Sequence, residues 1–357
     1  MQKTLADMAN YLIRLLPKKI PDDLALDTIF NDIAHTRSMR EGVGAFRDFM
    51  YCVYKHLVLV GARYDKPKKE AHPFVDGTNI APAYPFLCSI ASILTNIGIH
   101  GELCENGQTI TLANTDALIA TNNISRAKLT ASKTTDCLLF LIECGLQVEG
   151  IELGADKPCL PILTPIAFSY PKNAAMLIGL KVMAIAQCQL VTSSIQDILL
   201  RCDYRALANA EIDIFATLKD LILPLSDDVQ ETVIRLHEEY MSHGYKCTYY
   251  ALRFFFRFTY YCRSKELWRL NISLNNGCTI SIKSTNSNKY PDVVKKLPQQ
   301  LQDKIAKGYG CGKKLGITDS CDGGCRGFRV AIDDNFVGIY DNVKAWIDAE
   351  MQYMFKK

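Results

Sequence analysis

This sequence lacks the long apolar run that a membrane-spanning helix requires. Its longest apolar segment, residues 174–191, is interrupted by one lysine and two glutamines, whereas a helix needs about 20 nearly uncharged residues to cross a bilayer. The N-terminal residues also lack the apolar core of a secretory signal peptide and show the spacing of a surface helix. We therefore expect no membrane span, and we expect a buried helix at 174–191 in which Gly179 lets another helix approach closely.

The motifs of several common enzyme classes are absent as well. The chain has neither a G-x-S-x-G nor an H-E-x-x-H pattern. Residues 308–314 are rich in glycine, but their spacing is one residue short of a phosphate-binding loop, and Lys314 stands where that loop needs a hydroxyl. His237 and His243 fall on different faces of an expected helix, so they cannot act as a pair within it. The sequence therefore contains no motif that assigns catalytic residues.

Cysteine, in contrast, is abundant. The chain has 14 cysteines, and without an export signal this number indicates reduced thiols in the cytoplasm. Most of them lie inside apolar runs, where a cysteine behaves as a small hydrophobic residue. We expect no functional role for that majority.

The order of expected elements predicts an α+β protein. We expect N-terminal helices at 1–60, including one at 23–35, then a linker at 61–81 that is rich in proline and glycine. An α-rich domain at 82–224 and an α+β domain at 225–357 should follow.

The pattern of residues 82–168 predicts a helix, a hairpin, a second helix and a strand. Asn106 and Gly107 form a strong turn signal for the hairpin, and Gly145 is a suitable C-cap for the helix at 132–144. This order gives the segment some winged-helix character. An ordinary helix–strand unit is the alternative, because Lys133 is the only cation in the helix that would contact nucleic acid.

The C-terminal domain begins with residues that alternate between apolar and polar. From 254 to 285 this period of two predicts a three-stranded antiparallel meander with flanking helices, one of them at about 291–307. Phe256, Phe258 and Tyr260 should face inward, with Trp268 and Cys278 on the following strands.

A loop at 308–328 holds three cysteines, Cys311, Cys321 and Cys325, among several glycines. The last two have a spacing that occurs in zinc sites, and the glycines between them permit a tight turn. A fourth ligand of the usual type is missing because no histidine follows His243. Cys278 is our candidate for it, and Cys262, Asp322 or water are the alternatives. Unligated thiols or a reversible disulfide would also fit the pattern.

Positive charge is concentrated next to this loop. Residues 246–330 contain 16 Lys and Arg against 5 Asp and Glu, although the whole chain has a net charge of only +3. Cationic side chains bind phosphates, and aromatic rings stack on bases. We therefore predict a nucleic-acid contact on the polar face of the meander, with a solvated charged surface as the alternative. The residues of this prediction are Arg257, Tyr261, Arg263, Arg269 and Lys283.

Two runs, "YPKNAAMLIGLKVMAIAQ" at 170–187 and "GYGCGKK…CDGGCRGF" at 308–328, resemble segments of uncharacterised bacterial cytosolic proteins of this length. That resemblance implies a bacterial cytosolic origin and carries over no functional residues.

The sequence thus favours a non-catalytic binding or regulatory protein with a cysteine-ligated metal, zinc by preference, and a nucleic-acid or protein partner. One alternative is a thiol- or metal-dependent enzyme that uses Cys311, Cys321 or Cys325. The other is a protein–protein adaptor with neither metal nor nucleic acid.

Overall fold

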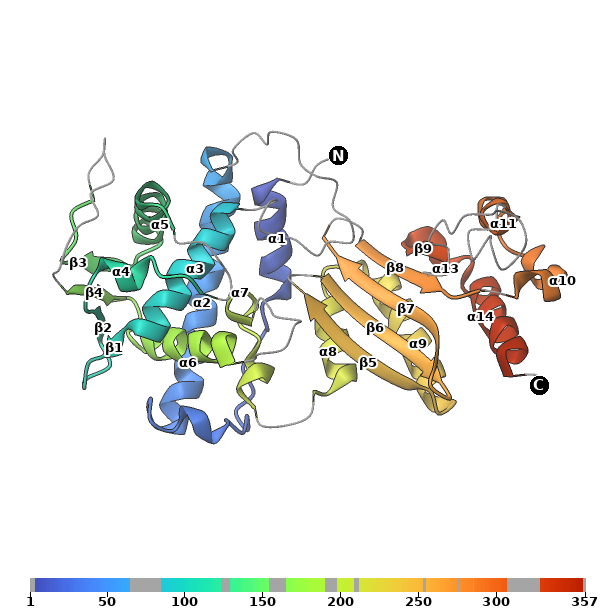
Figure 1. The fold of residues 1–357 in the computed structure, drawn as a ribbon, viewed down its shortest axis with the longest axis horizontal. Coiled ribbons are helices and arrows are strands. Elements are labelled where there is room, and N and C mark those ends of the chain that lie inside the picture. The colour runs from blue at the N-terminus through green and yellow to red at the C-terminus, as the bar shows by residue number, and fades with distance from the viewer. Residues whose placement is uncertain are drawn as a thin grey trace. The chain divides into compact units, whose positions relative to one another are not determined.

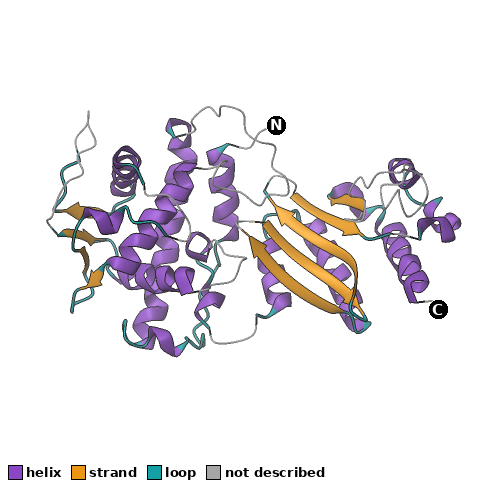
Figure 2. Ribbon diagram, in the orientation of Figure 1, coloured by secondary structure: helices purple, strands orange, loops and turns teal. Residues whose placement is uncertain are grey.

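The computed structural model describes residues 4–64, 85–122, 129–153, 165–189, 198–208, 212–252, 255–274, 277–284, 286–306 and 328–355. They form two compact units, Met1–Ile212 and Asp213–Lys357 (Figure 1). Each unit contains helices and one antiparallel sheet (Figure 2), so the chain is α+β as the sequence predicts. None of the helices in the described ranges is long and apolar enough to cross a membrane.

The N-terminal unit is built mainly from helices that pack around α6. Its helices are α1 (Leu5–Leu15), α2 (Thr36–Val60), α3 (Pro85–His100), α4 (Thr115–Leu118), α5 (Ala131–Glu143), α6 (Ala175–Gln189) and α7 (Ile198–Arg201). Short 3-10 turns lie at Thr28–Phe30, Gly61–Arg63 and Tyr204–Leu207. The helices on either side of the expected linker belong to this same unit, so residues 1–60 do not form a separate domain.

Helix α6 is the buried helix that the sequence predicts, and glycines bring it against α2. A Cβ atom added to Gly179 would lie 2.0 Å from the carbonyl oxygen of Gly42, and one added to Gly42 would lie 2.8 Å from the nitrogen of Gly179. Only glycine at both positions permits two helix backbones to pack this closely. The expected role of Gly179 is therefore confirmed, and α2 is its partner.

A four-stranded sheet lies beside these helices in the order β1-β2-β4-β3. Its strands are β1 (Glu102–Leu103), β2 (Thr109–Leu112), β3 (Gln147–Glu149) and β4 (Ile166–Ser169). The predicted hairpin is β1–β2, and Gly107 has the positive φ of +68° that its turn requires. Gly145 has a φ of +100° after α5, as a helix C-cap does. Strand β3 then pairs with β4.

The C-terminal unit extends the predicted meander to five strands in the order β5-β6-β7-β8-β9. The strands are β5 (Lys246–Leu252), β6 (Phe255–Cys262), β7 (Lys265–Ser273), β8 (Gly277–Ile282) and β9 (Phe328–Ile332). The helices are α8 (Ile214–Ile222), α9 (Asp227–Ser242), α10 (Pro291–Val294), α11 (Gln299–Ala306), α13 (Asp334–Val337) and α14 (Tyr340–Phe355), with a 3-10 turn at Ser287–Lys289. The two outer strands were not part of the predicted meander.

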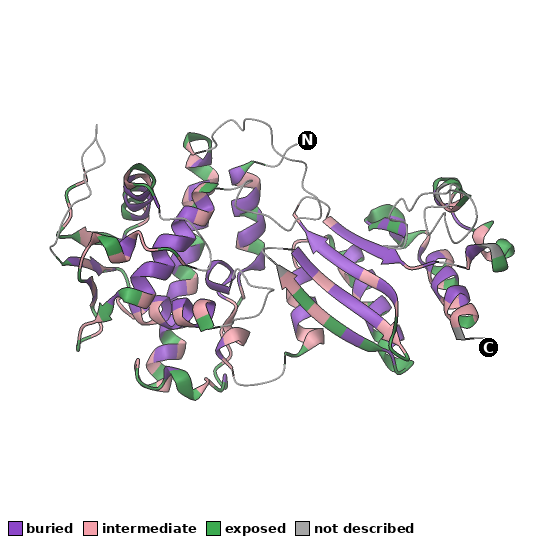
Figure 3. Ribbon diagram, viewed as in Figure 1, coloured by how far each residue is buried: buried purple, intermediate pink, exposed green. Residues whose placement is uncertain are grey.

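The inner face of this sheet holds the core, as the alternation predicts. Phe256, Phe258, Tyr260, Trp268 and Cys278 are all buried there. The central strands β6, β7 and β8 are accordingly largely buried (Figure 3). Helix α9 covers them: the ring of Tyr240 lies 5.2 Å from that of Trp268, and Nδ1 of His237 lies 2.8 Å from the hydroxyl of Tyr260. Helix α14 covers the far end of the face through Trp346 and Phe328.

Two predicted helices were wrong in their extent. Residues 23–35 form only the turn Thr28–Phe30, because the backbone N–H of Asp27 is bonded to Leu207 O instead of to a helical turn. The helix expected at 291–307 is interrupted between α10 and α11 at Pro298, which has no N–H to continue the ladder.

Candidate functional site

The cysteine loop lies outside the described residues, and with it Cys311, Cys321 and Cys325. The metal site therefore stays a prediction. Among the residues that the structure does describe, no group of three or more His, Cys, Asp and Glu side chains is placed to hold a metal ion.

Cys278, the candidate fourth ligand, lies on β8 within the apolar inner face. It pairs with Ile332, at the end of β9, whereas the cysteine loop enters β9 at Phe328. Phe328 and Ile332 are four residues apart, which is about 13 Å along the strand. Cys278 is 3% exposed, and burial raises the pKa of its thiol, so the thiolate that a metal binds is disfavoured there.

The basic residues of the nucleic-acid prediction lie on the outer face of the five-stranded sheet or at its edge. Arg257 pairs with Asn271 across β6 and β7, Arg269 pairs with Ser281 across β7 and β8, and Ser281 pairs with Arg329 on β9. We call this the basic sheet face. Cations of this face lie on β5, β6, β7 and β9 and directly after β8: Lys246, Arg257, Arg269, Arg329 and Lys283.

Arg263 and Tyr261 lie at one edge of the basic sheet face. Arg263 is exposed in the β6–β7 turn and has a φ of +45°. Tyr261 is half-buried on β6 opposite Lys246. The structure therefore brings all five sequence-predicted residues to one sheet and adds Lys246 and Arg329, which the prediction missed.

One carboxylate holds two of these cations. Glu266 is the only acidic residue in the five strands. Its Oε2 accepts a hydrogen bond of 2.6 Å from Nη2 of Arg269 and lies 3.0 Å from Nζ of Lys283. The side chain of Glu266 is only 11% exposed, so this pairing is partly shielded from water.

A row of short polar side chains positions Arg257. Its Nε donates to Oδ1 of Asn271 at 3.0 Å, and Nδ2 of Asn271 donates to Oγ of Ser281 at 3.2 Å. Asn271 and Ser281 are both buried. A ligand on the basic sheet face would therefore contact the longer cationic side chains such as Arg257. Asn271 and Ser281 would hold Arg257 in position.

A thiol next to a histidine–carboxylate pair occurs in the N-terminal unit. Nε2 of His56 on α2 lies 2.6 Å from Oε2 of Glu143 on α5, and Cys144 follows Glu143 in the chain. Burial, with smaller contributions from Cys52 and Glu143, raises the pKa of Cys144 to about 12. A nucleophilic cysteine needs the opposite shift, so we assign this pair to packing.

Glu350 is a second buried group with a structural explanation. It is 1% exposed on α14, and its carboxylate accepts hydrogen bonds from Ser284 Oγ, Tyr290 Oη and both nitrogens of Asn286. These donors compensate for the burial of the carboxylate. These hydrogen bonds connect the segment after β8 to α14.

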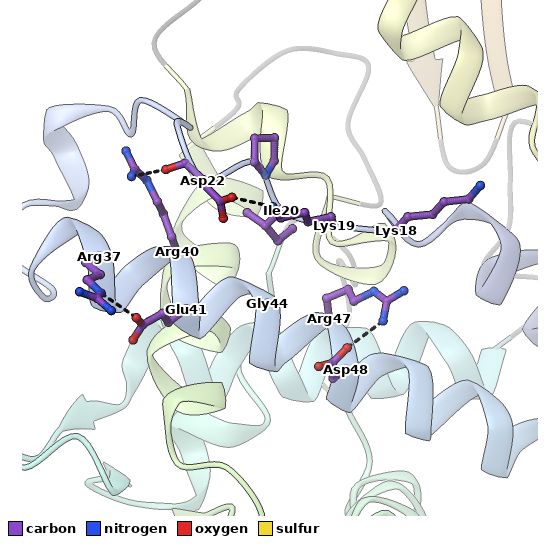
Figure 4. A pocket seen from close by; sticks show the side chains of 11 residues that line it. Lys18, Lys19, Ile20, Asp22, Arg37, Arg40, Glu41, Gly44, Arg47 and Asp48 are labelled. Carbon is purple, nitrogen blue, oxygen red and sulfur yellow. Dashed lines mark hydrogen bonds and ion pairs between the residues drawn. The ribbon is translucent and has the colours of Figure 1, made fainter.

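Sequence reasoning missed a pocket of about 540 Å³ in the N-terminal unit. One wall is α2, with Arg37, Arg40, Gly44 and Arg47, and the other is the segment 18–22 (Figure 4). Basic residues three and seven positions apart on one helix, Arg37, Arg40 and Arg47, were a signal in the sequence. These residues alone do not indicate a pocket, because the opposite wall, the segment 18–22, comes from another part of the chain.

Comparisons of the chain with protein-family models, with curated proteins and with solved structures gave no significant match. The resemblance to bacterial proteins therefore stays a prediction, and function has to be argued from the residues themselves.

Proposed function

We propose that this chain is a non-catalytic nucleic-acid-binding protein and that the basic sheet face contacts the phosphate backbone of a single strand. The observation that carries the proposal is the row of cations that lie on or directly after five neighbouring strands, with Glu266 as the only acidic residue in those strands. Such a surface attracts a polyanion and has no preference for one base sequence.

Aromatic side chains on the same face support a single strand over a duplex. Tyr250 is 37% exposed and lies opposite Arg257. Tyr261 is half-buried on the same face, opposite Lys246. Exposed rings stack on bases that are not already paired.

We place the contact on this sheet and not on the winged-helix-like unit at 82–168. The recognition helix of that unit would be α5, where Lys133 is the only cation. The winged-helix character remains a prediction about fold. Zinc bound by Cys311, Cys321 and Cys325 also remains a prediction, and the nucleic-acid proposal does not depend on it.

The test is the salt dependence of binding to a labelled single-stranded oligonucleotide. If all five cations contact phosphates, log K should fall with log salt with a slope of about −3.5. In Lys246→Glu/Arg329→Glu, which changes two exposed residues of the face, the slope should fall to about −2.

The control is Lys295→Glu/Lys296→Glu, which makes the same change in net charge at exposed residues between α10 and α11. This variant should keep the wild-type slope and most of the affinity. Equal losses in both double variants would mean that net charge and not this face attracts the strand. Absence of binding by the wild-type chain would refute the proposal and favour a protein partner.

A further inference from the structure

The pocket beside α2 is held open by two arginines of that helix. Nε of Arg47 donates to Pro17 O at 2.8 Å. Seven residues away along the helix, Arg40 donates to Leu24 O at 2.8 Å and to Asp22 O at 2.5 Å. The segment 18–22 is therefore attached to α2 on both sides of Gly44, and the hollow lies between these attachments (Figure 4).

Gly44 has no packing reason to be glycine. A Cβ atom added there would meet no atom within 4 Å outside its own helix, whereas one added to Gly42 would collide with α6. Glycine within a helix is less stable than alanine by about 1 kcal/mol. Its effect at position 44 is to leave the floor of the pocket without a side chain.

The charge of the pocket is positive. Five basic and three acidic residues line it. Arg40 donates to neutral carbonyl groups, which do not cancel its charge. Arg47 donates to Pro17 O through Nε and pairs through Nη1 with Oδ1 of Asp48 at 2.7 Å, but the Asp48 side chain is 72% exposed, so a bound phosphate would displace it at little cost. Lys18 has no hydrogen-bond or ion-pair partner in the described part of the chain. The remaining pairs, such as Arg37 with Glu41, are largely exposed and rearrange at little cost.

Charged and apolar groups are separated along the pocket. Lys18, Arg47 and Asp48 lie at one end, Arg37, Arg40 and Glu41 lie at the other, and Ile20 lies over Gly44 between them (Figure 4). A volume of about 540 Å³ is within the range of small-molecule sites. Arginine and lysine are the side chains that bind phosphate groups.

We propose that this pocket binds a phosphorylated small molecule of about the size of a mononucleotide. The phosphate lies at the end formed by Lys18 and Arg47, and the uncharged part of the ligand lies between Ile20 and Gly44. All of the lining residues belong to the N-terminal unit. The site is therefore separate from the basic sheet face and does not rest on the proposed nucleic-acid contact.

Calorimetric titration of the full-length chain tests this proposal, with adenosine monophosphate, ribose 5-phosphate, adenosine and inorganic phosphate as probes. We expect submillimolar binding of the monophosphate and no binding of adenosine. Gly44→Leu fills the floor of the pocket, so it should weaken binding of the monophosphate at least tenfold and leave binding of inorganic phosphate unchanged. Lys18→Glu should weaken both.

Two controls keep the test decisive. Gly44→Ala leaves most of the volume and should bind nearly as well as the wild type. Lys172→Glu changes the charge of another exposed lysine in the same unit and should have no effect. The proposal is overturned if no phosphorylated probe binds the wild-type chain, or if Gly44→Leu binds the monophosphate as well as Gly44→Ala does.

Discussion

The two units differ in how their central elements meet. In the N-terminal unit, α2 and α6 meet at Gly42 and Gly179, where backbone lies against backbone. In the C-terminal unit, large rings fill the space: the rings of Tyr260 and Trp268 are 3.6 Å apart, and His237 stacks on Phe215 at 5.1 Å. An interior made by close backbone approach is sensitive to added atoms, and one made of stacked rings is sensitive to changes in the groups it buries.

The cationic side chains of the two units also have different partners. In the pocket of the N-terminal unit, Arg40 and Arg47 donate to backbone carbonyls, and the carboxylates that pair with Arg37 and Arg47 are more than half exposed. On the basic sheet face, Arg269 and Lys283 share the partly buried carboxylate of Glu266. Removal of a carbonyl contact leaves a neutral group behind, whereas removal of Glu266 leaves two cations without their partner. Three substitutions or conditions test this contrast, in decreasing order of expected effect.

Gly179→Ala should have the largest effect. The new Cβ would lie 2.0 Å from Gly42 O, so α2 and α6 must move apart, and the free energy of unfolding should fall by about 3 kcal/mol. Hydrogen exchange of the α2 and α6 amides measures this change within the N-terminal unit. Gly44→Ala, two residues from Gly42 on the same helix, should instead raise stability by about 0.5–1 kcal/mol. A similar sign for both variants would contradict the close approach of the two helices.

Glu266→Gln should have the next largest effect. Its side chain is 11% exposed while those of Arg269 and Lys283 are 25% and 30% exposed, so the change leaves half-buried cations side by side. We expect a loss of about 2 kcal/mol, seen as faster hydrogen exchange in β7 and β8. The control is Glu41→Gln, since Glu41 and its partner Arg37 are 59% and 83% exposed. That change should stay within about 0.5 kcal/mol.

Acidification should have a smaller effect, beginning in the C-terminal unit. Burial lowers the pKa of His237 below its ordinary value of 6.5, an effect that Glu238 opposes and Lys219 adds to. The unfolded chain therefore takes up a proton before the folded chain does, so stability falls as the pH drops below 6.5. His237→Gln should remove this part of the pH dependence.

The N-terminal unit provides the comparison for that measurement. Burial alone would raise the pKa of Asp203, but Arg201 and Arg205 hold it below its ordinary value of 3.8. Its contribution to stability is therefore present above pH 3.8 and is lost only as the pH falls further. Between pH 6.5 and 4, amides of β6 and α9 should lose protection in the wild type and keep it in His237→Gln, whereas amides around Asp203 should not change. Equal loss in both units would contradict the assignment to His237.

Local patterns predicted much of the fold. The period of two identified the inner residues of β6, β7 and β8, and the hairpin at Asn106–Gly107 and the C-cap at Gly145 followed from glycine positions. The helix expected at 23–35 was wrong because a distant backbone group, Leu207 O, accepts from Asp27 N. A local pattern does not include a partner so far along the chain.

The residues of the candidate sites were likewise predicted only where a local pattern identifies them. The basic residues of the sheet were identified by alternation, since residues two apart on a strand share a face. Lys246 and Arg329 were missed because they lie on β5 and β9, which join the sheet only through strand pairing. The pocket was missed because one of its walls, the segment 18–22, has no regular structure and is placed by Arg40 and Arg47.

By itself, the sequence determined the α+β class, the buried helix α6 with its glycine, and the alternating faces of the C-terminal strands. These properties depend on neighbours within one turn or one strand, so the order of the residues is sufficient. Only the tertiary structure decided which strands border the basic sheet face and that Gly42, unlike Gly44, packs against a second helix. The physical reason is that both depend on contacts between segments far apart in the chain, which form only when the whole unit buries its apolar surface.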